Sequence, residues 1–580
     1  MRKYLISRSR LAAASLAFAA FAVIPAIPQS ATPTPFIRPA VTVTDNLTAK
    51  PTASPGRSLS DLQADIRARL QRPELRRGQV GIKIVSLNTG KVVFEENAEK
   101  YFMPASNMKN FTVATALEKL TPDYRFVTSV FARAMPDASG TIKGDLRIYG
   151  RGDVSLSTAF FPTAAELAAA GSVQNGTSRS SVDAVYYQGI DKLIDKIIAA
   201  GVKRIDGSII GDDSYFKGYP IPGGWEWDDL QWYYGAEVSS LPINDSAVDL
   251  EVKPGPVGYS CSVKLTPYNP VYRVKNLCTT TPAGTPRTLR IEKELGQNVL
   301  TISGTLPAGN GGTQNSIGVS RPAELFAALL RMRLEQRGIE VTGQYRADNS
   351  AAAAPSLVEI AKLESPPLAL IAAKTMKPSQ NMYTETLLWT LGEEARKRMS
   401  APEPAPAATD SPTRTSGPAL APISVQQESS ADLGLAEVKS FLSSIGITPD
   451  AVLQYDGSGL SRHNLITPSA VVQLYTYMAK ESKYSQAWRD SLTIGGVDGT
   501  LANRFKGTAA QNNMRGKTGT IDQVSALSGY VTTAAGEPLV VSFIVNGVPT
   551  GRDRTSMMDD IVVALAKFNG NIDEVRTTSR

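Results

Sequence analysis

The two ends of this chain carry matching patterns, a β-hairpin beside an amphipathic helix, although several hundred residues separate them. Residues 80–94 alternate between apolar and polar side chains around an Asn-Thr-Gly turn, which predicts a pair of strands. Residues 525–532 and 539–545 repeat this pattern near the other end. Helices are expected from Ser58, before the first hairpin, and over 552–567, after the second. Strands beside helices at both ends favour one sheet assembled from both parts of the sequence.

Between these ends, residues 127–345 consist mostly of short strands broken by turns, with helical patterns only near 184–200 and 322–337. A block of this kind between two helix-rich parts predicts one or two inserted domains. The length of 580 residues leaves room for such domains, because a chain of this length is expected to form roughly two to four domains of ordinary size. We therefore expect a mixed α/β (α+β) fold, an antiparallel sheet between helices, built from residues 58–126 and 346–580.

The N-terminal residues 1–31 have the pattern of an export signal. Basic residues lie among the first ten positions, and Leu11–Ile24 is uncharged and apolar. This run is shorter than the roughly 20 residues of a membrane-spanning helix. We expect a cleaved signal that leads to the periplasm or cell envelope, with an uncleaved anchor as the alternative. Residues 32–57, rich in Pro and Thr, predict a linker, and the Pro-rich stretch 401–430 predicts a disordered loop.

Charge and cysteine content limit the classes of partner. The net charge of +7 is spread along the chain, and no block of Lys and Arg resembles a nucleic-acid patch. Nucleic acid is therefore not expected as a partner, whereas peripheral association with a membrane stays open. The two cysteines, Cys261 and Cys278, could form a disulfide in an exported protein. The sequence alone leaves this pairing undecided.

The chain contains a single histidine, His463. A Ser-His-Asp or Cys-His centre would depend on that one residue, and a metal site with two histidines is excluded. We expect neither a metal nor a cofactor. A hydrolase of this composition needs another base. A buried lysine can serve, because desolvation and nearby positive charge lower its pKa.

Three short motifs supply such a centre. Ser106-Asn107-Met108-Lys109 follows Pro104, a residue that favours the start of a helix, so that Ser106 and Lys109 would share one helical face. Ser379-Gln380-Asn381 lies between two apolar helices, and Lys517-Thr518-Gly519-Thr520 precedes the C-terminal hairpin. The glycine would let a substrate backbone approach closely. S-x-x-K, S-x-N and K-T-G in this order are typical of penicillin-binding proteins and β-lactamases.

On these motifs the sequence resembles the class C low-molecular-mass penicillin-binding proteins, the D-Ala-D-Ala carboxypeptidase/endopeptidase family, over about residues 58–567. The stretches Gly211-Asp212-Asp213-Ser214 and Asp456-Gly457-Ser458-Gly459-Leu460-Ser461-Arg462 are also similar to the family. The family is marked by a long insertion between its first two motifs, and this chain has one. The resemblance implies a serine β-lactamase/transpeptidase-like sandwich. The Pro-rich segment 401–430 departs from the family pattern and looks like an added loop.

The resemblance implies a catalytic role for five residues. Ser106 would attack the carbonyl of the penultimate D-Ala, and Lys109 would take its proton. Ser379 would relay the proton to the leaving amine, and Asn381 would bind the substrate amide. Lys517 would supply positive charge. A covalent acyl-enzyme on Ser106 would then be released by water.

It also implies residues that bind substrate. Thr518 and Thr520 would hold the terminal carboxylate, and Gly519 would let the substrate backbone approach. The backbone N–H groups of Ser106 and Thr520 would form the oxyanion hole. Relatives bind the free end of the diaminopimelate side chain through an acidic residue, an aromatic residue five positions later and an arginine. The matching residues in this sequence are Asp229, Tyr234 and Arg462.

The implied partners are peptidoglycan stem peptides as substrates and β-lactams as covalent inhibitors. Cleavage would fall at the D-Ala-D-Ala bond, and the balance with cleavage of D-Ala-diaminopimelate cross-links stays open. One alternative is a β-lactamase of the same fold, which the long insertion disfavours. Another is a catalytically silent envelope-binding protein, which the complete motifs disfavour.

Overall fold

The computed structural model describes residues 57–162, 180–350, 357–400 and 428–572. The predicted signal 1–31 and all but the last residue of the predicted linker 32–57 lie outside these ranges. So does the predicted loop 401–430, apart from its last three residues. Within the four described ranges, no helix combines the length and apolar character needed to cross a membrane.

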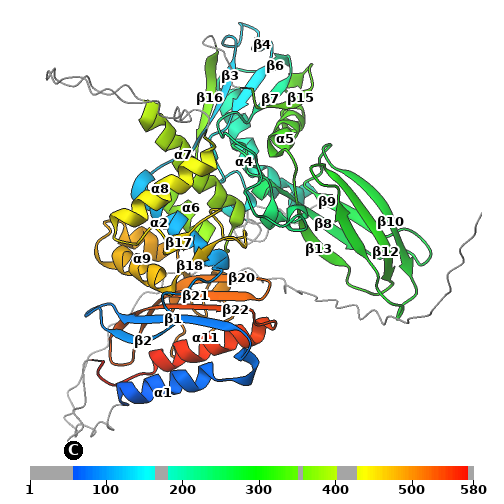
Figure 1. Cartoon of the computed structure of the whole chain (residues 1–580). Helices are drawn as coiled ribbons and strands as arrows, with labels where there is room; N and C mark the ends of the chain where they lie inside the picture. The colour runs from blue at the N-terminus through cyan, green and yellow to red at the C-terminus, as the bar shows by residue number, and fades with distance from the viewer. Residues whose placement is uncertain (1–56, 163–179, 351–356, 401–427, 573–580) are drawn as a thin grey trace, which may run out of the picture. The chain divides into compact units, whose positions relative to one another are not determined.

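A six-stranded antiparallel sheet joins the two ends of the chain (Figure 1). The N-terminal hairpin pairs with the C-terminal strands, because Val80 lies opposite Val545 and Ser86 opposite Leu539. The prediction of one sheet shared by both ends is therefore confirmed. The strands, in spatial order, are β19 (Thr493–Ile494), β20 (Arg515–Ile521), β21 (Val524–Thr532), β22 (Pro538–Asn546), β1 (Gln79–Ser86) and β2 (Val92–Glu96).

Helices α1 (Leu59–Leu70) and α11 (Gly551–Ala566) cover one face of this sheet (Figure 1). Helix α1 begins where Ser58 accepts a hydrogen bond from the backbone N–H of Asp61, whose own side chain accepts from the Ser58 N–H. This reciprocal cap satisfies two N–H groups that the helix cannot pair internally. Leu62 and Ile66, one turn apart, are fully buried against the sheet.

The opposite face of the sheet carries a layer of helices. Alternate residues of β22 separate the two cores, since Val541 and Phe543 pack with α1 and α11 whereas Val540 and Ile544 pack with this layer. The helices are α2 (Lys109–Leu120), α6 (Leu368–Met376), α7 (Asn381–Ser400), α8 (Ser430–Ser444), α9 (Pro468–Lys480) and α10 (Ser485–Ser491). A short hairpin of β17 (Val452–Leu453) and β18 (Leu465–Ile466) lies between α8 and α9 in the chain.

The inserted segment leaves the helical layer after α2 and returns before α6. Its five-stranded sheet has the order β15-β7-β5-β3-β16, and a three-stranded sheet has the order β14-β6-β4. β16 pairs with β3, so the strands of the five-stranded sheet continue to Glu364. The elements are β3 (Val127–Ala132), β4 (Thr141–Lys143), β5 (Leu146–Tyr149), α4 (Ser180–Ala199), β6 (Arg204–Asp206), β7 (Ile209–Asp212), α5 (Pro322–Gln336), β14 (Glu340–Val341), β15 (Tyr345–Asp348) and β16 (Val358–Glu364).

Two further three-stranded sheets complete the insertion. One has the order β13-β8-β9 and the other β10-β12-β11. A disulfide joins Cys261 to Cys278, which settles the pairing that the sequence left open. The strands are β8 (Ala247–Lys253), β9 (Ser262–Thr266), β10 (Arg273–Thr281), β11 (Arg290–Lys293), β12 (Val299–Pro307) and β13 (Thr313–Gly318).

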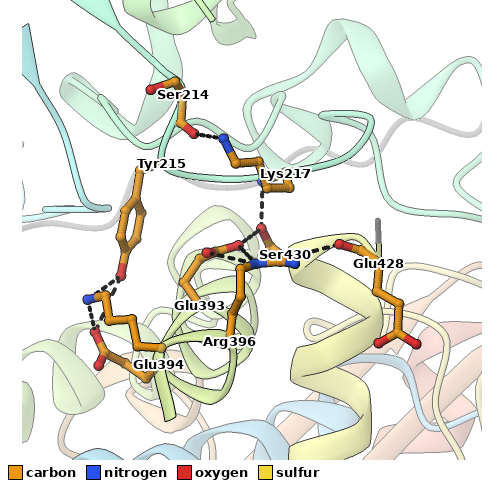
Figure 2. Close-up of polar contacts among 9 residues, drawn as sticks. Ser214, Tyr215, Lys217, Glu393, Glu394, Arg396, Glu428 and Ser430 are labelled. Atoms are coloured by element: carbon orange, nitrogen blue, oxygen red, sulfur yellow. Dashed lines mark hydrogen bonds and ion pairs between the residues drawn. The ribbon is translucent and has the colours of Figure 1, made fainter. Parts of the chain in front are cut away.

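Polar contacts attach the insertion to helices α7 and α8 (Figure 2). The backbone N–H of Lys217 donates to Ser430 Oγ at 2.6 Å, and Ser430 donates in turn to the carboxylate of Glu393. Arg396 forms an ion pair with Glu393 at 3.1 Å and donates to the backbone carbonyl of Glu428 at 2.7 Å. These contacts hold the end of α7 and the start of α8 together against the insertion.

Candidate active site

Ser106 lies on a tight turn that leads into α2. The turn is a 3₁₀ helix, Ala105–Met108, with Pro104 at its N-cap, and α2 continues directly from it. Ala105 has a left-handed backbone with φ 47°, which directs the chain abruptly into the turn. Ser106 is partly exposed while its neighbours Asn107 and Met108 are buried. The hydroxyl of Ser106 is therefore the accessible polar group of this turn.

Lys109 is fully buried, and its amine touches three oxygens. The distances from Nζ are 2.9 Å to Ser106 Oγ, 2.6 Å to Asn381 Oδ1 and 2.7 Å to the backbone carbonyl of Ser458. The last two oxygens can only accept hydrogen bonds. A neutral amine has two N–H donors and one lone pair, so it donates to these two oxygens. Its lone pair then faces the one partner that can donate, the hydroxyl of Ser106.

A backbone carbonyl of the insertion fixes the orientation of the Asn381 side chain. Asn381 is the first residue of α7, and its Nδ2 donates to the carbonyl of Tyr234 at 2.9 Å. Since Nδ2 is engaged there, Oδ1 is the atom that faces Lys109. Ser379 precedes the helix in a left-handed conformation with φ 68°. The second motif thus lies against both the nucleophile turn and the insertion.

Lys517 extends from β20 into the same centre. Its amine is buried and donates to Ser379 Oγ at 2.8 Å and to the backbone carbonyl of Thr518 at 2.8 Å. Asn107 Nδ2 donates to the carbonyl of Lys517 at 3.1 Å, which joins the strand to the nucleophile turn. The three motifs predicted from the sequence therefore meet at one place.

Gly519 allows β20 to lie against this turn. A Cβ at position 519 would lie 2.5 Å from the carbonyl oxygen of Pro104 and 3.1 Å from the backbone nitrogen of Ser106. We expected the glycine to leave room for a substrate backbone, but its nearest neighbour is the protein's own turn. The two residues next to Gly519 differ in exposure. Thr518 is buried and donates a hydrogen bond to Thr500 Oγ1 at 2.7 Å, whereas Thr520 is exposed.

The loop 456–462 lies against the turn from the other side. Asp456 accepts hydrogen bonds from the backbone N–H groups of Gly459 and Ser461, each at 2.7 Å, and from the side chain of Asn464 at 2.8 Å. Gly459 has φ 84°, and a Cβ there would collide with the carbonyl of Ala105. Buried hydrogen bonds of this kind give the loop one conformation, which directs the Ser458 carbonyl to Lys109.

Burial lowers the pKa of both lysines. The pKa of Lys109 falls to about 7, mainly through desolvation, although the carboxylates of Asp456 and Glu385 act in the opposite direction. Desolvation and then the neighbouring Lys109 hold the pKa of Lys517 well below its ordinary value. A lysine with a pKa near neutrality can act as a general base at physiological pH.

The residues predicted to recognise the substrate side chain lie near one another. Tyr234 donates a hydrogen bond to the carboxylate of Asp229, and the pKa of Asp229 is raised to about 6 by burial and by the charges of Asp228 and Glu226. Arg462 donates from Nε to Glu226 Oε1 at 2.5 Å and from Nη2 to Oε2 at 2.8 Å. The sequence analysis did not identify Glu226, because nothing in the local sequence relates it to a residue 236 positions later.

Comparison with known proteins shows the family to which this sequence belongs. The sequence profile of the D-Ala-D-Ala carboxypeptidase 3 (S13) family matches residues 62–411 and 420–568. The interruption between the two matched parts lies within the Pro-rich segment. A D-alanyl-D-alanine carboxypeptidase of Actinomadura sp. (strain R39) is 30% identical over 527 residues, which cover 89% of this chain and 86% of the relative. The D-alanyl-D-alanine carboxypeptidase DacB of Haemophilus influenzae is 24% identical, covering 81% of this chain and 86% of the relative.

The fold is also that of a solved structure. The crystal structure of penicillin binding protein 4 (dacB) from Haemophilus influenzae superimposes with a TM-score of 0.69 at 21% sequence identity. The match covers 87% of this chain and all of that protein. The same protein complexed with a β-lactam gives a TM-score of 0.63 at 21% identity, over 86% of this chain and 97% of that one.

Proposed function

This chain belongs to the D-Ala-D-Ala carboxypeptidase 3 (S13) family, and we propose that its serine DD-peptidase activity uses Ser106 as the nucleophile and Lys109 as the general base. The single observation that supports these roles is the arrangement of Lys109. Its amine lies 2.9 Å from the Ser106 hydroxyl, and its two other partners can only accept hydrogen bonds. The family membership makes the enzyme a hydrolase of D-Ala-D-Ala peptides.

Acylation begins when neutral Lys109 takes the proton of Ser106. The oxygen of Ser106 then attacks the carbonyl carbon of the penultimate D-Ala, and the negative charge that forms on the carbonyl oxygen needs N–H donors. The backbone N–H groups of Ser106 and Thr520 are the proposed donors. The C–N bond to the terminal D-Ala breaks as its nitrogen gains a proton. An ester between Ser106 and the peptide remains.

Ser379 delivers that proton. Its hydroxyl accepts a hydrogen bond from Lys517 at 2.8 Å. It passes its proton to the leaving nitrogen and regains one from Lys109, the proton that Lys109 took from Ser106, so that Lys109 becomes neutral again. Burial lowers the pKa of Lys517, and a substrate carboxylate beside it would raise that pKa and favour the charged amine. Thr518 and Thr520 are the proposed hydrogen-bond donors to that carboxylate. Binding of the correct substrate thus promotes the protonated state that the relay requires.

Deacylation uses water in place of the departed D-Ala. Lys109, neutral again, takes a proton from the water, whose oxygen attacks the ester carbon and releases Ser106. A β-lactam follows the same first step, but its cleaved amide nitrogen stays attached to the acyl group and obstructs the water. The proposal therefore includes covalent inhibition by β-lactams on Ser106.

Recognition of the substrate side chain is assigned to Asp229, Tyr234 and Arg462. A carboxylate and a guanidinium at one site suit a zwitterionic amino-acid terminus, such as the free end of diaminopimelate in peptidoglycan. Arg462 donates two hydrogen bonds to the carboxylate of Glu226. The incoming carboxylate would have to replace Glu226, which makes this ion pair part of the selection of substrate.

Peptidoglycan is the proposed partner, and this assigns the chain to the periplasm or cell envelope. The signal proposed for residues 1–31 would direct export. Peripheral contact with the membrane is compatible with the mild positive charge. We also place the inserted segment between residues 127 and 364, because β16 pairs with β3, and the catalytic domain on either side of it.

Digestion of purified muropeptides, monomeric and cross-linked, with identification of products by mass, tests this function. Release of free D-Ala by the unaltered chain, and its loss in Ser106→Ala, is the expected result. Disappearance of cross-linked dimers would add endopeptidase action. Rapid turnover of a chromogenic cephalosporin without a stable adduct on Ser106 would instead indicate a β-lactamase, and D-Ala release by Ser106→Ala would overturn the assigned nucleophile.

A further inference from the structure

Glu385 is a fully buried carboxylate beside the base, and the mechanism above does not use it. It lies on α7 one turn after Asn381, with an exposed fraction of 0%. No lysine or arginine among the described residues forms an ion pair with it at contact distance. A buried carboxylate without a direct counter-charge is costly, so its surroundings indicate what it does.

The partners of Glu385 are two consecutive backbone N–H groups. Gly457 donates to Oε2 at 2.9 Å, and Ser458 donates to Oε1 at 2.8 Å. The carbonyl of the same Ser458 accepts from the amine of Lys109 at 2.7 Å. Thr112, on α2, holds the neighbouring carbonyl of Gly457 at 2.9 Å. Glu385 thus fixes the backbone at Gly457 and Ser458, and with it the position of the Ser458 carbonyl oxygen that contacts Lys109.

These two hydrogen bonds also determine the charge of Glu385. Each oxygen faces an N–H group, so a protonated acid would place its O–H against a donor. The hydrogen bonds favour the ionised carboxylate, while burial and then the charge of the neighbouring Asp456 raise the pKa of Glu385. Its negative charge in turn raises the pKa of Lys109, together with that of Asp456 and against the effect of desolvation. Lys517 is the other charged group that faces Lys109.

We propose that Glu385 is a positioning residue for the general base. Glu385 holds the Ser458 carbonyl against Lys109, and it supplies negative charge close to Lys109, with only the backbone of Ser458 between them. The inference rests on the proposed roles of Ser106 and Lys109. It assigns two separable effects to one side chain. The length of Glu385 sets the position of the Ser458 carbonyl, and its charge sets the pH at which Lys109 becomes neutral.

Glu385→Gln and Glu385→Asp separate these effects. The experiment measures the rate of acylation by a fluorescent penicillin across a range of pH, with the melting temperature of each variant. In Glu385→Gln the charge is lost, so the acid limb of the profile should move to lower pH by about one unit. In Glu385→Asp the charge is kept, but the side chain is shorter by one methylene. Its limb should stay in place while the plateau rate falls by about tenfold or more.

Glu393→Gln is the matched control, because Glu393 is another buried carboxylate of α7, paired with Arg396 and remote from Lys109. It should lower the melting temperature without moving the limb. If Glu385→Gln lowers the rate equally at every pH, Glu385 is only structural and the inference is wrong. Should Glu385→Gln fail to fold, a limb that moves in Glu385→Asp overturns the inference instead. Failure of the unaltered chain to acylate at Ser106 would refute the proposed function itself.

Discussion

The side-chain amide of Asn381 donates to the backbone carbonyl of Tyr234 at 2.9 Å, and this contact determines which end of the amide faces the base. Asn381 belongs to the helical layer, whereas Tyr234 belongs to the insertion between α2 and α6. The insertion therefore takes part in organising the catalytic centre. Its Tyr234 segment is within hydrogen-bond distance of a residue that contacts Lys109.

Asn381→Asp should shift the pH dependence of acylation. The substitution keeps an oxygen for Lys109 but adds a negative charge beside it, which stabilises the protonated amine. The unaltered chain should gain activity as pH rises through about 7, the pKa of Lys109. In Asn381→Asp the acid limb should lie higher by about one unit, which makes acylation at pH 7 about fivefold slower. Acylation rates with a fluorescent penicillin measure both limbs, and a limb that moves to lower pH would contradict the assigned base.

Glu226→Gln should improve the binding of substrates whose side chain ends in a free carboxylate. Removing the negative charge weakens the hold on Arg462, although Asp522 stays 3.8 Å from it, and an exposed ion pair contributes about 1 kcal/mol or less. The expected result is a KM about two- to fivefold lower with kcat unchanged. Peptides with a lysine side chain in place of diaminopimelate serve as the control, since they lack the carboxylate. An equal change in KM for both peptides would show that Arg462 does not bind the side-chain carboxylate.

Gly519→Ala should reduce both stability and acylation. The added methyl group would lie 2.5 Å from the Pro104 carbonyl, so β20 must move away from the nucleophile turn. We expect a loss of about 2–3 kcal/mol in the free energy of unfolding and acylation slower by about a hundredfold. Gly311→Ala is the matched control, because a Cβ at that position meets nothing within 4 Å. Normal labelling of Gly519→Ala would show that the strand can retreat without disturbing Ser106.

Replacing both cysteines by serine should destabilise the insertion without changing catalysis. Cys261 and Cys278 are 17 residues apart, and closing a loop of this size stabilises a fold by about 3 kcal/mol. Denaturant unfolding of the Cys261→Ser/Cys278→Ser variant should show an earlier transition. Penicillin labelling under native conditions should keep its rate. A slower rate would indicate that these small sheets support the catalytic centre.

Much of the fold and the centre could be predicted because the relevant signals are local. The apolar spacing of Leu62 and Ile66 and the cap at Ser58 predict α1, and the spacing of Ser106 and Lys109 predicts their contact. These two features depend on a few residues close in sequence. The convergence of the three motifs is not local, and it follows from the family resemblance that their order carries.

The rest depends on contacts that local patterns do not contain. Glu226 meets Arg462 across 236 positions, and Tyr234 acts on Asn381 through a backbone carbonyl, which any residue has. Glu385 lies in a helix that is buried over most of its length, where a carboxylate has no distinctive spacing. At Gly519 the sequence indicates that a backbone approaches closely, but it cannot show that the turn of Ser106 lies there.

The pairing of β1 with β22 has a consequence for biosynthesis. The serine turn is synthesised well before the strand that carries Lys517 and the strand that pairs with β1. Until those strands exist, the first hairpin has an unpaired edge, and its partner must be found over a long sequence separation. A nascent polypeptide of this kind is therefore inert towards its own substrate and towards penicillin until both strands have been synthesised.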